Sequence, residues 1–420
     1  MGGPVNRSTV LRAGMLLTIT NIVTGALNYA YQILMGRLLT PGEFVAMNAI
    51  LALGVVCASP LYAIVMWVTG QVAAAMAYND TQLVRRFYKR STAVLVAVWI
   101  VGLAILFAVM PYVEGYMRIT DRPSLWLFGV ATGVGACVLV NGAFLQGLQR
   151  FAWLGGLGVL AAVLRIVVSV WFVVQFDWGV RGALGGTLLS VLLLWLMGSA
   201  AIAVSIRAPA EVRSRSVHPF VAKELVPMML FAVAFAVMTQ LDMVLVNHYF
   251  EPSTSSAFAP AAILGKAVLY LPNGIAAAMF PMIARNRSAA KPSGRILKQA
   301  MPAAIALCGC MVLVFFLFGE HVIGMMYGNR YEAAGSLLAP YSLALFPMAV
   351  VVLVAHFLIA QGKALFSWFF FACAVMEVAT IHFWHPHLGA VVAVLGAYNT
   401  LLAIVGCGML WLEESLADSD

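Results

Sequence analysis

Uninterrupted runs of apolar residues, about twenty or more residues long, recur along this 420-residue chain. An α-helix needs a run of that length to cross the hydrocarbon core of a bilayer. Hydrophobic residues make up 63% of the chain and charged residues only 10%, against about 25% in a soluble protein. An outer-membrane barrel would require alternating segments of about ten residues, which are not found. The sequence therefore predicts an all-α, polytopic membrane protein.

Twelve membrane spans are expected. The first six cover roughly residues 11–35, 44–77, 92–112, 124–148, 152–175 and 183–205, and the second six roughly 226–249, 256–282, 299–318, 335–360, 365–384 and 389–411. The second span is long and contains Pro60, which predicts either a kink or an extension beyond the bilayer. We expect two six-helix lobes, residues 1–210 and 226–420, the second with a short acidic tail, joined by a cytoplasmic linker at 211–225.

The distribution of lysine and arginine predicts the orientation of the chain. With a cytoplasmic N-terminus, seventeen of these residues fall in inside segments and five in outside segments. Both termini are therefore expected in the cytoplasm, in a multi-pass protein of the cell inner membrane. This placement also accounts for the net charge of +8, so no nucleic-acid partner is expected.

Short matches between the two halves occur in the same order at a near-constant offset. They are Leu39-Thr40-Pro41 with Phe250-Glu251-Pro252, Ala49–Ala52 with Ala262–Gly265, Pro60 with Pro272, Gln146-Gly147 with Gln361-Gly362, and Gly182-Ala183 with Gly389-Ala390. These matches predict a duplication. Because each half has six spans, the two lobes would have the same orientation, related by a parallel pseudo-two-fold axis normal to the membrane.

Four ionisable residues lie well inside predicted spans: Arg165, Asp242, Lys266 and Glu377. Charges at membrane depth are costly and usually face a bundle interior or a water-filled cavity. In a structural interpretation, Asp242 pairs with Lys266 and Arg165 with Glu377. In a functional interpretation, Arg165 and Lys266 bind an anionic ligand, while Asp242 and Glu377 couple the cycle to an ion.

The segment from Asp242 to Pro281 holds two of these charges, together with a proline and a glycine inside a span. It is therefore predicted to form the wall of a transporter cavity. Arg37 is either a stop signal or an anion guide at the outer mouth. Uncharged polar residues suit a hydrated cavity or helix contacts: Asn21, Asn28, Gln32, Asn48, Asn141 and Gln240.

No feature of the sequence indicates an enzyme or a cofactor. The chain has no P-loop of the GxxxxGK[ST] type, so ATP hydrolysis by that route is excluded. All six cysteines lie in apolar runs and are expected to be buried hydrophobic residues, neither disulfides nor metal ligands.

Several ordered motifs resemble the bacterial polysaccharide flippases, which belong to the multidrug, oligosaccharidyl-lipid and polysaccharide exporter superfamily. They are YQILMGRLLTPGE at 31–43, LQGLQRF at 145–151, GVRGA at 179–183, LDMVLV at 241–246, LGKAVLYLPNGIAAAMFP at 264–281 and YGNRY at 327–331. With twelve predicted spans, the chain is shorter than the fourteen-span peptidoglycan-precursor flippases. The resemblance therefore favours a flippase of oligosaccharide repeat units.

This resemblance implies a two-lobed, V-shaped bundle that moves an undecaprenyl-pyrophosphate-linked oligosaccharide to the outer leaflet by alternating access. The implied partners are this substrate, a coupling ion (H⁺ or Na⁺), membrane lipids and a polysaccharide polymerase. The substrate would be bound by Arg165, Lys266, Arg37 and Asn141, and the ion by Asp242 and Glu377. The first alternative is a multidrug antiporter of the same superfamily, and the second is a glycan ligase or polymerase, which the short outer loops disfavour.

Overall fold

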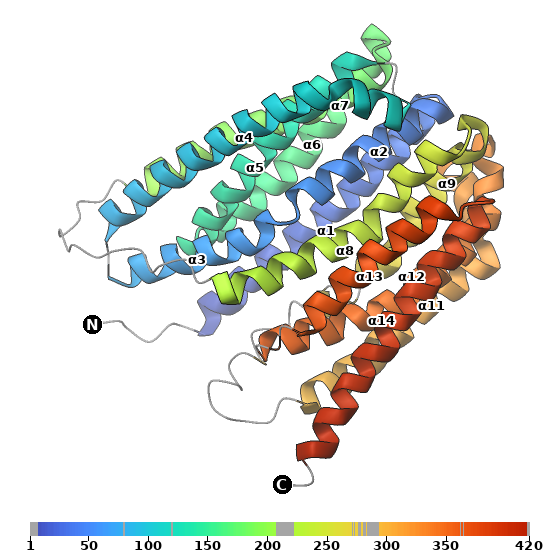
Figure 1. The fold of residues 1–420 in the computed structure, drawn as a ribbon. Coiled ribbons are helices and arrows are strands. Elements are labelled where there is room, and N and C mark those ends of the chain that lie inside the picture. The colour runs from blue at the N-terminus through green and yellow to red at the C-terminus, as the bar shows by residue number, and fades with distance from the viewer. Residues whose placement is uncertain are drawn as a thin grey trace. The chain divides into compact units, whose positions relative to one another are not determined.

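The computed structural model describes residues 7–78, 80–118, 121–206, 222–270, 294–361 and 365–417, with a few single positions between 272 and 283 and Lys363. These residues form thirteen α-helices and two short 3₁₀ turns (Figure 1). The all-helical class predicted from the apolar runs is therefore confirmed. Most of the predicted linker at 211–225, and Pro281 of the predicted cavity wall, lie outside the described residues.

The chain divides into two compact units. Unit 1 comprises residues 1–54 and 60–221, and unit 2 comprises 55–59 and 222–420. Unit 1 contains α1 (Arg7–Leu38), most of α2 (Pro41–Ala58), α3 (Leu61–Ala77), α4 (Thr81–Met117), α5 (Arg122–Gly147), α6 (Phe151–Phe176) and α7 (Gly179–Ser205). Unit 2 contains α8 (Ala222–Tyr249), α9 (Pro252–Gly265), η1 (Lys266–Leu269), α11 (Gly294–Tyr327), η2 (Asn329–Tyr331), α12 (Glu332–Ala360), α13 (Leu365–Phe383) and α14 (Leu388–Ala417).

The helices of the two units pack in the same order. In unit 1, α1 packs on α6, α3 and α4 pack on α5, and α7 packs on α5 and α6. In unit 2, α8 packs on α13, α9 and α11 pack on α12, and α14 packs on α12 and α13. Each contact in one unit thus has a counterpart in the other, as the duplication predicted from the matched motifs requires.

Ten of the helices are long and apolar enough to cross a membrane, namely α2, α4 to α8 and α11 to α14. The sequence predicted twelve spans, and two of them are not among these ten. The predicted first span forms α1, which is long but carries Thr18, Thr20, Asn21 and Thr24 in its middle. The predicted eighth span is interrupted where α9 passes into η1 at Lys266.

The predicted kink at Pro60 is a complete break between two helices. α2 ends at Ala58, and Pro60 is the N-cap of α3. The Ser59 hydroxyl donates to the carbonyl of Val56 at 2.7 Å, which satisfies one carbonyl of the α2 terminus. Proline has no N–H to continue the hydrogen-bond ladder, so the second predicted span consists of two shorter helices.

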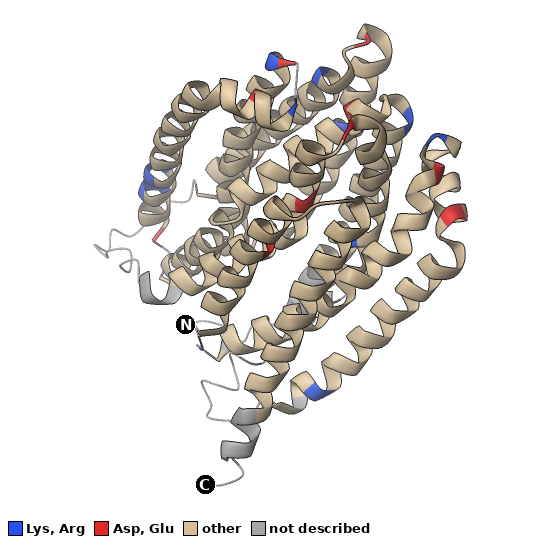
Figure 2. Cartoon of the chain, turned by 45° about the vertical axis from the view of Figure 1, so that its right-hand side comes forward, with Lys and Arg blue, Asp and Glu red and all other residues tan. Residues whose placement is uncertain are grey.

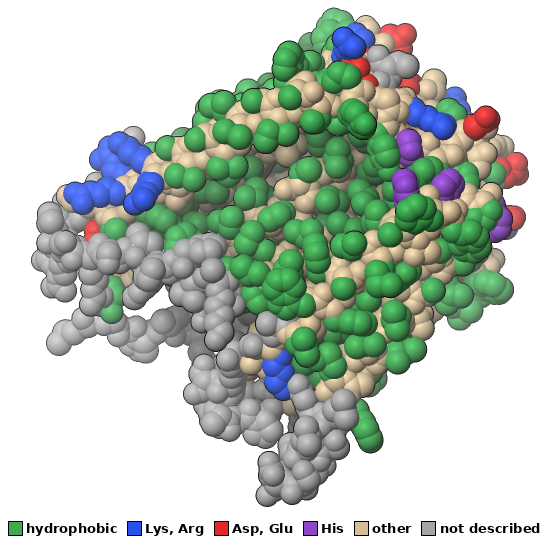
Figure 3. Space-filling model, viewed as in Figure 1, with side chains coloured by type: hydrophobic (Ala, Val, Ile, Leu, Met, Phe, Trp, Pro, Cys, Tyr) green, Lys and Arg blue, Asp and Glu red, His purple; other side chains and the backbone are tan. Residues whose placement is uncertain are grey.

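Apolar side chains cover the helix faces, and most charged residues lie near the helix ends, although a few acidic residues lie midway along helices (Figures 2 and 3). In the apolar part of α4 only 6% of residues are buried, and Val94, Val98, Val101, Ile105 and Phe107 are exposed. Exposed apolar area of this extent is stable only against lipid.

The contact between α6 and α7 depends on a glycine. A Cβ added to Gly186 would lie 2.5 Å from the backbone nitrogen of Ser169, which is too close for any side-chain adjustment. We expect Gly186→Ala to destabilise unit 1 by about 1–3 kcal/mol through overpacking. Gly135→Ala is the matched control, because a Cβ there has no neighbour within 4 Å. Thermal unfolding in detergent checks both variants, and equal stability of the two would contradict this account of the contact.

Candidate functional site

A buried ion pair joins two of the predicted site residues in unit 2. Asp242 on α8 is 2% exposed, and its Oδ1 accepts a hydrogen bond from Nζ of Lys266 at 3.1 Å. Its Oδ2 accepts a hydrogen bond from the hydroxyl of Tyr341 on α12. Both oxygens of this carboxylate are therefore engaged, as a charge at this depth requires.

The local sequence explains how these three side chains meet. Lys266 lies where α9 gives way to the 3₁₀ turn η1, and short 3₁₀ stretches inside helices often mark functional sites. The preceding Gly265 lets the Tyr341 ring approach, since a Cβ there would lie 2.5 Å from that ring. Phe258 packs edge-on against the same ring, with centroids 5.4 Å apart. The tyrosine is thus held against α9 with its hydroxyl directed at Asp242.

Glu377 on α13 is the second acidic group of this cluster. It is 2% exposed, and its Oε2 has no hydrogen-bond partner among the described residues. Its carboxyl group is close enough to Asp242 and Tyr341 to interact electrostatically with both. A buried oxygen without a partner is costly, and a proton or a small hard cation would satisfy it. We call Asp242, Lys266, Tyr341 and Glu377 the acidic cluster.

Arg165 is the centre of a different arrangement in unit 1. It lies about 21 Å along α6 from Phe151, in a helix that is otherwise almost wholly apolar. Its Nε donates to Thr187 Oγ1 on α7 at 3.1 Å, and its guanidinium lies 3.8 Å from the ring centroid of Tyr31 on α1. None of the ion pairs found among the described residues includes Arg165. These neighbours therefore orient the guanidinium group, but they do not neutralise its charge.

The two arrangements occupy equivalent places in the repeat. Tyr31 and Asp242 each lie seven residues before the end of α1 and α8, which are matched by position. Tyr31 lies under the guanidinium of Arg165 on α6, and Asp242 interacts electrostatically with Glu377 on α13, the matched helix. The two equivalent positions thus differ in chemistry. In unit 1 an arginine lies over an aromatic ring, and in unit 2 one carboxyl group interacts with a second carboxyl group. The duplication has preserved the location and changed the charge.

The remaining predicted site residues lie elsewhere. Asn141 is buried on α5 and is fully engaged: it accepts from the Tyr88 hydroxyl at 2.8 Å and donates to the Trp195 carbonyl and Ser199 Oγ. This pattern is typical of a helix contact, and a substrate-binding role for Asn141 stays a prediction. Arg37 is exposed in the last turn of α1. The predicted Arg165–Glu377 pairing stays a prediction, because the two residues belong to different units.

Tyr31, Thr187 and Tyr341 complete the arrangements and were not predicted. Each is one of many aromatic or hydroxyl residues in apolar spans, so its type alone gave no signal. Tyr31 could have been found from the matched motifs, because the offset that relates Pro41 to Pro252 also relates Tyr31 to Asp242. Tyr341 directly follows Pro340, a proline inside a helix, where bending commonly accompanies function.

Among known proteins, no family model and no curated sequence matches this chain. Solved structures do match. An inward-facing multidrug resistance MATE family transporter of the MOP superfamily aligns with a TM-score of 0.78 at 16% identity, over 97% of this chain and 98% of the other. This chain has the MATE fold. An outward-facing structure of a multidrug resistance MATE family transporter of the MOP superfamily aligns with a TM-score of 0.69 at 16% identity, over 97% of this chain and 96% of the other.

A third structure with the MATE fold is a MOP superfamily transporter from Pyrococcus furiosus. It aligns with a TM-score of 0.67 at 16% identity, over 96% of this chain and 95% of the other. The binding pocket of that protein is reported to have reversed polarity, which suggests a different function for it. Sequence identity this low establishes the MATE fold alone, and the ligand has to be argued from side chains.

Proposed function

We propose that this protein is a flippase that carries an undecaprenyl-pyrophosphate-linked oligosaccharide from the inner to the outer leaflet by ion-coupled alternating access. The observation that carries this proposal is the contrast between the two equivalent positions. Unit 1 has an arginine that pairs with no acid in the described part of the chain, and unit 2 has the acidic cluster. An anionic substrate and a cation would then be bound by different units of the same chain.

Arg165 suits a pyrophosphate better than the other ionisable side chains that the structure places deep inside the described helices. A guanidinium stays charged at membrane depth and binds phosphate oxygens through two parallel hydrogen bonds. In Arg165 only Nε is engaged, by Thr187, which leaves the terminal nitrogens for a ligand. Lys266 is a weaker candidate, because Asp242 already neutralises its charge at 3.1 Å. In this proposal Lys266 holds the carboxyl group of Asp242 in place, and Arg37 guides the anion.

Coupling to an ion would depend on the acidic cluster, with Glu377 as the group that exchanges H⁺ or Na⁺. We expect Glu377→Gln to lower gradient-driven transport at least tenfold, because an amide cannot take up a proton or replace a carboxylate as a cation ligand. Thermal unfolding should change little, since the two side chains have the same shape. Glu251→Gln is the control: this glutamate is exposed and makes no side-chain cap to α9.

The measurement uses the purified chain in liposomes that contain a fluorescent lipid-linked oligosaccharide. The fraction of substrate accessible to a membrane-impermeant reagent is followed with and without an H⁺ or Na⁺ gradient. Wild type and Glu251→Gln should respond to one of the two gradients, and Glu377→Gln to neither. If Glu377→Gln responds as wild type does, then this residue does not couple transport to the ion.

A multidrug antiporter is the second candidate, and one observation favours it. The unpartnered, buried oxygen of Glu377 could bind an organic cation as well as a small one, and two of the similar solved structures are multidrug resistance transporters. Against it stands Arg165, which would repel a cationic drug in unit 1. Resistance to cationic drugs that depends on Glu377 and is unaffected by Arg165→Ala would favour this candidate.

The proposed activity has no step in which a covalent bond is made, so we infer a transporter and not an enzyme. A flippase of this kind would work in the cell inner membrane and deliver its product to a polysaccharide polymerase.

A further inference from the structure

We propose that a groove on unit 1 is a binding site for an anionic phospholipid, separate from the site of transport. The groove has a volume of about 680 Å³ and lies among α3, α4 and α5. Most of its lining is apolar, with Trp67 and Val68 from α3, Phe87 and Leu95 from α4, and Val140 from α5. The proposal does not depend on what the protein transports.

The floor of the groove is part of the packed core of unit 1. Val68 and Val140 are 2% and 6% exposed, and both belong to one buried cluster. Trp67 meets Phe87 edge to face, with ring centroids 5.7 Å apart, and Phe87 packs on Phe144. A floor of locked aromatic and β-branched side chains gives an acyl chain a fixed surface to lie on.

The charged end of the groove is formed by α4. Arg86, Arg90, Val94 and Val98 all line the groove and follow one another at intervals of four residues, so they form one stripe along the helix. The stripe begins with two guanidinium groups and continues with two exposed valines, over about 18 Å. Figure 3 shows basic side chains gathered over the first part of α4. This order, cation first and apolar surface next, matches a lipid with a phosphate head and acyl tails.

The length of α4 places the two arginines at headgroup level. The helix has 37 residues and therefore spans about 55 Å, well beyond a hydrocarbon core of about 30 Å. The distribution of basic residues assigns its N-terminal end to the cytoplasmic side. The cytoplasmic leaflet carries anionic lipids, and basic pockets between helices on that side suit their headgroups.

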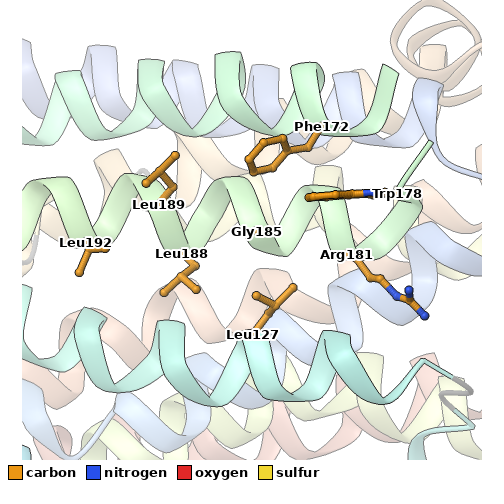
Figure 4. Close-up of a pocket in the computed structure, with 8 residues that line it drawn as sticks. All are labelled: Leu127, Phe172, Trp178, Arg181, Gly185, Leu188, Leu189 and Leu192. Atoms are coloured by element: carbon orange, nitrogen blue, oxygen red, sulfur yellow. The ribbon is translucent and has the colours of Figure 1, made fainter. Parts of the chain in front are cut away.

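A second groove of unit 1 provides an internal contrast. It has a volume of about 510 Å³ and is lined by Leu127, Phe172, Trp178, Gly185 and three further leucines of α7, with Arg181 at one end and its guanidinium directed away from the apolar lining (Figure 4). Arg181 forms an ion pair with Asp121. Its charge is therefore already satisfied, whereas the ion pairs found among the described residues include neither Arg86 nor Arg90. Only the first groove offers cationic groups without a carboxylate partner.

Head and tail must act together at this site. Both arginines are exposed, and exposed charges bind small anions weakly because water and salt screen them. The apolar lining alone would accept any lipid tail. A phospholipid that is both anionic and acylated gains from both parts, which is the reason for preferring it to free phosphate or to a zwitterionic lipid.

Native mass spectrometry of the full chain in detergent tests the proposal, with equimolar phosphatidylglycerol and phosphatidylethanolamine. Phosphatidylglycerol should be retained about tenfold more strongly, and Arg86→Gln with Arg90→Gln should remove this preference. Val94→Trp, which fills the groove and leaves both arginines, should also remove it. Arg181→Gln should keep it. Thermal unfolding without lipid shows that the variants are folded.

Four outcomes would overturn the proposal. Equal retention of the two lipids by wild type, or unchanged retention after Val94→Trp, would mean that no specific groove binds the lipid. Equal stabilisation by inorganic phosphate would mean that the acyl chains contribute nothing. If a polyprenyl phosphate displaces phosphatidylglycerol, and added phosphatidylglycerol does not displace the polyprenyl phosphate in turn, the groove is a site for the polyprenyl phosphate instead.

Discussion

Arg165→Ala is expected to abolish transport of a pyrophosphate-linked substrate while the protein remains folded in the membrane. Two charge-assisted hydrogen bonds from a guanidinium to phosphate contribute about 3 kcal/mol or more, so affinity should fall at least about a hundredfold. The loss of stability should be small, because the residue makes one side-chain hydrogen bond and one contact with a ring. Binding of the lipid-linked substrate to purified protein measures the effect directly.

Two further variants separate the charge of Arg165 from its orientation. Tyr31→Phe keeps the ring beneath the guanidinium and should bind substrate as wild type does, whereas Thr187→Val removes the hydrogen bond to Nε and should weaken binding by a smaller factor. Arg165→Lys restores the charge without the planar fork and should recover only part of the affinity. Full affinity in Arg165→Ala would exclude this residue from the substrate site.

Lys266→Met is expected to cost about 3–5 kcal/mol of stability, because it leaves the carboxylate of Asp242 buried without its cation. The double variant Asp242→Asn with Lys266→Met should recover much of that loss, since it removes both charges together. Thermal unfolding of the two single variants and the double variant in detergent measures the coupling. Lys89→Met, at an exposed position, is the control.

Additive losses in this cycle would show that Asp242 and Lys266 do not stabilise each other. Glu377→Gln belongs to the same comparison with the opposite expectation, because Oε2 of this residue has no hydrogen-bond partner in the part of the chain that the structure describes. A large loss of stability there, equal to that of Lys266→Met, would make Glu377 a structural residue.

The fold class could be predicted from the sequence, because apolar runs long enough to cross a bilayer are compatible with few structures other than membrane-spanning helices. The sequence also indicated the repeated packing, through the motifs that match between residues 39–183 and 250–390. The break at Pro60 was predicted only as a kink, since the sequence cannot show whether a proline bends a helix or ends it. Ten of the twelve predicted spans contain helices that are long and apolar enough to cross a membrane; among the described residues, α1 carries polar side chains in its middle and α9 ends after 14 residues at the 3₁₀ turn.

The charged residues of the candidate site could be predicted from the sequence, whereas the uncharged residues that contact them could not. An ionisable residue inside an apolar run is visible in any sequence, and the Asp242–Lys266 pairing was one of the two interpretations that opposite charges on adjacent spans allowed. Tyr31 and Tyr341 are two of thirteen tyrosines, and only the packing of α1 on α6 and of α12 on α9 selects them. The sequence cannot show whether Asn141 binds a ligand or joins helices, because a polar residue at membrane depth looks the same in either role; the structure adds its hydrogen bond to the Trp195 carbonyl.

The most direct test of the central claim is the leaflet in which lipid-linked oligosaccharide accumulates in cells that lack this gene. The account predicts intact repeat units on undecaprenyl pyrophosphate trapped at the cytoplasmic face, released by the wild-type gene and not by Arg165→Ala. Lipid-linked units that reach the outer leaflet at the normal rate without the gene, in cells with no second flippase, would contradict it.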